Sequence, residues 1–131
     1  MYEAETLGVR VRVRPRFLER ESDPERDRFV WAYTITIENH SQDTVQLVSR
    51  RWRITDDNGL TEAVEGPGVV GEQPVLEPGQ AFEYTSAAPL RTASGVMVGW
   101  YQMVRAKDRS SFEAAVPAFP LDSPYAKQLP N

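Results

Sequence analysis

The chain has 131 residues and no cysteine, a length that suits one domain and a composition that excludes a disulfide framework and a thiolate metal cluster. Its net charge of -4 at pH 7 argues against nonspecific nucleic-acid binding, because the overall field repels phosphates. The residues after Met1 are too acidic for a secretory signal, and no run approaches the ~20 apolar residues that span a bilayer. We therefore expect a cytoplasmic protein that is neither exported nor inserted in a membrane.

Alternation of apolar and polar residues, the signature of half-buried strands, begins near the N-terminus. Val9, Val11 and Val13 alternate with arginines, and a loop rich in Ser, Asp, Pro and Glu follows over residues 19–28. Residues 29–37 carry the strongest strand pattern of the chain, because five aromatic or branched side chains share one face. These two segments predict the first two strands.

The middle of the chain predicts a hairpin and a glycine-rich loop. Residues 44–55 form a long predicted strand, which we expect to be bent or bulged near its paired arginines. The turn at residues 56–59 leads into a returning strand over residues 60–65, and its Asn58-Gly59 pair favours a type I′ turn. Residues 66–71, Gly-Pro-Gly-Val-Val-Gly, follow directly and are called the glycine loop below.

Three more predicted strands cover residues 80–86, 96–104 and 111–117, and the chain has no convincing amphipathic helix. About seven short strands separated by turns predict an all-β fold, an immunoglobulin- or fibronectin type III-like β-sandwich. We assign residues 1–125 to this domain and residues 126–131 to an extended C-terminal tail.

The glycine loop matches a dinucleotide-binding fingerprint as a string, through Gly66, Gly68 and Gly71. That fingerprint works only where a helix N-terminus receives the pyrophosphate, and Pro74 interrupts any helix here. Pro67 also removes one backbone donor. We expect no dinucleotide and no other cofactor.

Two other interpretations of the glycine loop stay open. Free N–H groups from Gly68 to Gly71 could form an anion-binding concavity, with Arg50 or Arg51 nearby. Alternatively, the glycines serve only a turn with unusual φ angles.

No residue set specifies catalysis or metal binding. His40 is the only histidine and falls in a predicted turn, and residues 56–59 lack the ligand spacing of a calcium loop. No pair of acids stands out from the surface population. We expect neither an enzyme nor a metal site. The aromatic residues of the strands are expected to fill the core, although alternation leaves open which of them face solvent.

Several segments together resemble the ApaG family: residues 33–39, 47–56, 66–74, 83–86, 95–101 and 117–121. The resemblance implies a fibronectin type III-like sandwich, a bacterial cytoplasmic protein, a link to cobalt and magnesium resistance or efflux, and a protein-interaction role as in eukaryotic members. Two positions depart from the family pattern. Arg51 stands where the family usually has histidine, and Ala87 where it usually has glycine.

We therefore expect a non-catalytic interaction module of the ApaG family that binds another protein and acts indirectly in cobalt and magnesium homeostasis. The alternative is a binder of a small anionic ligand, a nucleotide or pyrophosphate, at the glycine loop. The candidate contact residues are the same for both: Gly66, Gly68, Val69, Val70, Gly71, Arg50 and Arg51.

Overall fold

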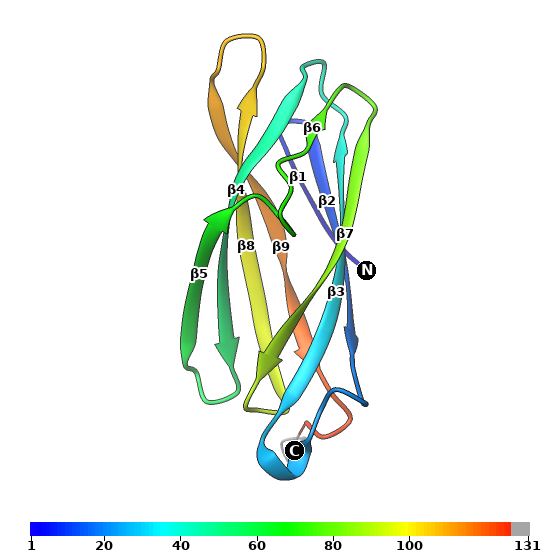
Figure 1. Cartoon of the computed structure of the whole chain (residues 1–131), viewed down its shortest axis with the longest axis vertical. Helices are drawn as coiled ribbons and strands as arrows, with labels where there is room; N and C mark the ends of the chain where they lie inside the picture. Colours follow the sequence, from blue (N-terminus) through cyan, green and yellow to red (C-terminus); the bar gives the residue numbers. More distant parts are fainter. Residues whose placement is uncertain (127–131) are drawn as a thin grey trace.

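The computed structural model describes residues 1–126 as two antiparallel sheets packed face to face (Figure 1). One sheet has the order β1-β2-β3-β7, and the other has the order β5-β4-β8-β9, with β6 added beside β4. The strands are β1 (Tyr2–Thr6), β2 (Val9–Phe17), β3 (Phe29–Asn39), β4 (Val45–Asp56), β5 (Thr61–Pro67), β6 (Val75–Leu76), β7 (Ala81–Leu90), β8 (Ser94–Arg105) and β9 (Ser111–Asp122). The predicted all-β sandwich is confirmed.

Two of the nine strands were not expected from the alternation. β1 is rich in acids, and its Glu3 and Glu5 lie across from arginines of β2, with Arg12 Nε 3.1 Å from Glu3 Oε2 and Arg10 Nε 3.1 Å from Glu5 Oε1. β6 is only two residues long and carries too little sequence pattern to predict. A short 3-10 turn, η1 (Pro24–Arg26), lies in the charged loop before β3.

The core lies between the sheets and is built from alternate residues of facing strands. Val9, Val11 and Val13 of β2 are fully buried. Trp31 of β3 spans the layers, because its indole Nε1–H donates to the Asp122 carbonyl of β9 at 2.7 Å. Most strand aromatics are buried, as the sequence predicts; they are Phe29, Trp31, Tyr33, Trp52, Tyr84, Tyr101 and Phe119.

The two sides of the sandwich differ. On one side β1 lies against β9, where the Ala115 N–H donates to Thr6 Oγ1 at 3.1 Å. The other side is bounded by β5 and β7, which each end their own sheet. The glycine loop and β6 lie on this second side, between β5 and β7 in the chain and in Figure 1.

The β4–β5 hairpin forms as predicted, but its turn type differs. Only Gly59 has a positive φ in the turn, whereas a type I′ turn would also need one at Asn58. Asp56 Oδ1 accepts the N–H groups of Asn58 and Leu60, both at 2.9 Å, and this side-chain bond holds a longer turn. The Asn58-Gly59 pair therefore predicted the position of the hairpin correctly, but the predicted type I′ turn is wrong.

Of the predicted tail, residues 127–131 lie outside the described residues. Within residues 1–126, no helix is long and apolar enough to span a membrane.

Asn39 is the buried polar residue that joins the turn after β3 to β6. Its Nδ2 donates to the carbonyls of Asp43 at 2.8 Å and Leu76 at 2.9 Å, and its Oδ1 accepts from the N–H and hydroxyl of Ser41. Every polar position of the amide is used, so the site specifies asparagine.

We predict that Asn39→Asp lowers the free energy of unfolding by about 3 kcal/mol, because two buried carbonyls lose their donor and face a carboxylate instead. Urea denaturation measures the change. Asn58→Asp, the same substitution at an exposed turn position, is the control and is expected to stay within about 0.5 kcal/mol of the parent. Equal losses in both variants would contradict the role of Asn39.

Candidate functional site

A β-bulge in β4 decides which way the paired arginines point. The register of β4 against β8 shifts between Leu47 and Ser49, which leaves Val48 as an extra residue, and this confirms the expected irregularity. Because of this shift, Arg50 lies on the inner face with buried Trp52, whereas Arg51 lies on the outer face. Although Arg50 and Arg51 are adjacent in the sequence, their side chains therefore lie on opposite faces of the sheet.

Arg50 fastens the glycine loop to the sandwich. Its Nη1 donates to the carbonyls of Pro67 and Gly68, both at 3.0 Å. The guanidinium lies directly against Gly66, where a Cβ would come within 2.9 Å of Nη1. A side chain at this position would displace the Arg50 guanidinium, so Gly66 serves close packing rather than backbone conformation.

The bulge also supplies the anchor for the loop backbone. The Val48 carbonyl accepts the Gly68 N–H at 2.8 Å and Gln73 Nε2 at 2.9 Å. Gly68 has φ +58, and a Cβ there would lie 2.2 Å from the Glu72 carbonyl oxygen, so no other residue fits. The loop is consequently held at its base by both a side chain and the backbone.

The tip of the glycine loop is a two-residue turn with an unusual residue in it. Val69 and Glu72 exchange backbone hydrogen bonds of 2.8 and 2.9 Å around Val70 and Gly71, which have φ of +44 and +80. Val69 is fully buried in the core, but Val70 is 55% exposed. A β-branched residue with positive φ is an outlier that costs about 1–3 kcal/mol.

The structure therefore brings together six of the seven candidate residues and separates Arg51 from them. The N–H groups of Gly68 and Val69 are donated to backbone carbonyls, so of the four expected anion donors only those of Val70 and Gly71 have no backbone partner among the described residues. Arg50 is bonded to loop carbonyls. The N–H groups of Gly68 and Val69 and the Arg50 guanidinium are thus already used in hydrogen bonds within the protein.

Sequence reasoning missed a buried tyrosine pair behind Arg50. The hydroxyls of Tyr84 and Tyr101 are 2.5 Å apart, and burial raises the pKa of both well above the ordinary tyrosine value. Burial also raises the pKa of Tyr33, while its hydrogen bond to Ser86 and the nearby Arg50 charge act in the opposite direction. All three phenols therefore stay neutral at pH 7, and none can serve as a base.

Arg51 belongs to a separate patch on the outer face of the second sheet. Its guanidinium carbon lies 4.8 Å from the centroid of the Trp100 ring, and that of Arg53 lies 5.7 Å from the same ring. Arg51 Nη2 is also 3.0 Å from Glu113 Oε2. Trp100 is thus the strand aromatic that faces outward beside arginines, which alternation alone could not decide.

His40 lies in the turn after β3, as predicted, with Nε2 3.1 Å from Glu38 Oε1. Among residues 1–126 no group of three or more His, Asp or Glu side chains is arranged to hold a metal ion.

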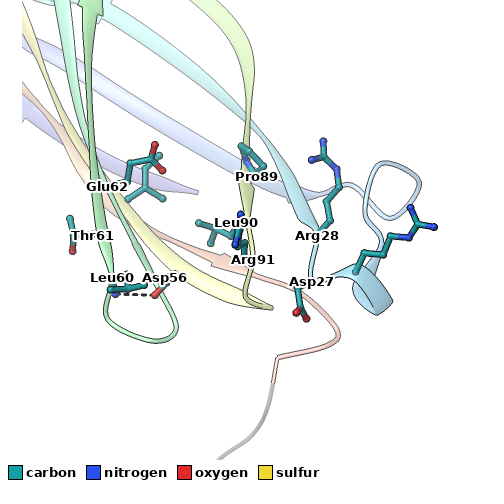
Figure 2. A pocket seen from close by; sticks show the side chains of 11 residues that line it. Asp27, Arg28, Asp56, Leu60, Thr61, Glu62, Pro89, Leu90 and Arg91 are labelled. Atoms are coloured by element: carbon teal, nitrogen blue, oxygen red, sulfur yellow. Dashed lines mark hydrogen bonds between the residues drawn. The ribbon is translucent and has the colours of Figure 1, made fainter.

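A cleft of about 820 Å³ lies at the end of the sandwich where the β4–β5 hairpin turns (Figure 2). It lies between the β4–β5 hairpin and the neighbouring ends of β3 and β7. Arg28 and Arg91 contribute to one wall and Glu62 to the other. None of the candidate residues lines this cleft.

Comparison with known proteins gives strong matches. Residues 19–105 match the family model described as the ApaG domain. Protein ApaG of Rhodospirillum centenum is 56% identical over 131 residues, which is all of both chains, and Protein ApaG of Maricaulis maris is 60% identical over 124 residues, or 95% of each. The crystal structure of an ApaA protein from Bordetella pertussis is 42% identical, covers 90% of this chain and 95% of its own, and superimposes with a TM-score of 0.86.

We predict that Val70→Asn raises the free energy of unfolding by about 1 kcal/mol, because asparagine tolerates positive φ far better than valine. Val75→Asn is the matched control, since Val75 is also 55% exposed but lies in a strand with ordinary φ. Chemical denaturation of both variants measures the difference. A Val70→Asn protein no more stable than the parent would show that the turn stores no strain.

Proposed function

Since the chain belongs to the ApaG domain family, we propose that it is a non-catalytic β-sandwich module that binds a partner protein through the Val70 tip of its glycine loop. The observation that carries this proposal is the conformation of Val70, which is exposed and has a φ of +44. A valine there costs folding energy and buries little surface in return. Contact with a partner protein explains why an exposed, strained position carries an apolar side chain.

The way the loop is held supports this role. Val69 is fixed in the core, and Arg50 and the Val48 carbonyl fix the base of the loop. A tip that is already ordered loses little conformational entropy when it binds, so more of its contact energy contributes to affinity. Strain at a residue held by its surroundings is typical of binding and switch segments.

The chemistry of the loop favours docking over catalysis. The polar groups at its tip are backbone groups, and Arg50, the charged side chain that contacts its base, is bonded to loop carbonyls. No acid and base are paired there to transfer a proton. The part in cobalt and magnesium homeostasis that the family resemblance implies is then exercised indirectly, through the partner, inside the cytoplasm.

We predict that Val70→Asn weakens capture of the partner at least tenfold while the protein remains folded. The control is Leu7→Asn, because Leu7 is also exposed, has φ +48 and precedes a glycine in a tight turn, but lies between β1 and β2. Immobilised parent, Val70→Asn and Leu7→Asn proteins are compared by quantitative pull-down from lysate of a bacterium that encodes the chain.

A partner that is lost with Val70→Asn and kept with Leu7→Asn is the expected result. Loss of binding together with a gain in stability cannot come from unfolding. Equal recovery of all proteins by the three baits would reject the Val70 tip as the contact surface.

A further inference from the structure

The cleft in Figure 2 has the volume of a small-molecule site and combines apolar with charged lining residues. Its volume of about 820 Å³ falls within the range of ligand pockets, which is about 300–1,000 Å³. Ile54, Leu60, Pro89 and Leu90 supply an apolar lining. Leu60 is 69% exposed, so much of this apolar surface is in contact with water.

Two arginines that line the cleft leave β3 and β7 at neighbouring backbone positions. Arg28 directly precedes Phe29 and Arg91 directly follows Leu90, and Phe29 and Leu90 are paired across β3 and β7. The two positive charges therefore leave adjacent strands at neighbouring positions, an arrangement that repels. Among the described residues neither arginine has a carboxylate within ion-pair distance.

The remaining charges of the cleft are distributed unevenly. Arg26 is directed to Asp23, with Nε 3.5 Å from Oδ2, and Asp56 Oδ1 is bonded to backbone N–H groups of its turn. Glu62 pairs with Ile54 across β4 and β5 and lines the wall of the second sheet, and Asp27 lies beside Arg28 at the rim. Arg28 and Arg91 therefore add more positive charge to their wall than Asp27 offsets, whereas Glu62 makes the opposite wall negative.

We propose that this cleft binds a small organic anion, a carboxylate or phosphate joined to an apolar body. The anionic group lies between Arg28 and Arg91, whose planar guanidinium groups match the oxygens of either anion. The apolar body rests on Ile54, Leu60 and Leu90, and Glu62 sets the orientation by excluding the anionic end from its wall. The cleft and the Val70 tip share no residue, so this site goes beyond the proposed docking function and does not depend on it.

The test is a two-dimensional NMR titration of the full chain with benzoate, phenyl phosphate, inorganic phosphate and the neutral benzyl alcohol. Benzoate and phenyl phosphate distinguish a carboxylate ligand from a phosphate ligand. We expect one or both to shift amide signals of residues 27–29, 54–62 and 89–91 at millimolar concentration. Inorganic phosphate and benzyl alcohol are expected to bind at least tenfold more weakly, since each lacks half of the recognised chemistry.

Variants separate specific binding from surface attraction. The double variant Arg28→Gln, Arg91→Gln is expected to weaken the preferred anion at least tenfold, whereas Arg53→Gln, an exposed arginine on the outer face, leaves it unchanged. Glu62→Gln is expected to strengthen binding about threefold by removing a repelling charge, a gain that a merely structural residue would not give.

Three results would overturn the proposal: no shift at 10 mM of either organic anion, equal affinity in the double-arginine variant, or shifts confined to residues 68–72. Shifts confined to residues 68–72 would show that the anion binds at the glycine loop instead of the cleft. None of these titration results changes the outcome expected of the Val70→Asn pull-down. Either proposal can therefore be rejected without the other.

Discussion

One extra residue in β4 determines how this sandwich presents its surface. Without the bulge at Val48, strand alternation would direct Arg51 and Arg53 into the core and turn Trp52 toward water. With it, Trp52 packs between the sheets and Arg50 comes to the side bounded by β5 and β7. The same bulge leaves the Val48 carbonyl to accept the N–H of Gly68. The position of the glycine loop follows from this single irregularity.

The glycine loop is bonded to the sandwich at its base and carries a strained residue, Val70, at its tip. Val69 completes the core, and Val70 is left outside in a conformation that valine rarely adopts. Arg50 contributes through hydrogen bonds and packing against Gly66 rather than as a free positive charge. This is why a segment that reads as a phosphate-binding fingerprint is better suited to docking, and why anion recognition is assigned to the separate arginines of the cleft.

Much of the fold could be predicted from alternation, because buried residues recur at period two in the first half of β2, the second half of β3 and the middle of β8. β1 could not, since its acidic side chains find their partners only on β2 and its edge is bonded to β9, both of which depend on the folded pairing. The grouping of the glycine loop with Arg50 was predictable, but the separation of Arg51 was not, because the exact residue at which β4 bulges decides which side chains after it face the core, and the sequence indicates only an irregularity near the arginines. The cleft depends on Arg28 and Arg91, which are far apart in the chain and meet only through strand pairing.

The most direct test of the account is amide hydrogen exchange of Gly68 and Val69 in Arg50→Met, measured under conditions where local opening dominates. If Arg50 fastens the loop, both amides should exchange at least tenfold faster than in the parent, while the amide of Ile35 in the core strand β3 changes much less. Unchanged protection at Gly68 and Val69 would show that the loop holds itself in place and would contradict the role given to Arg50.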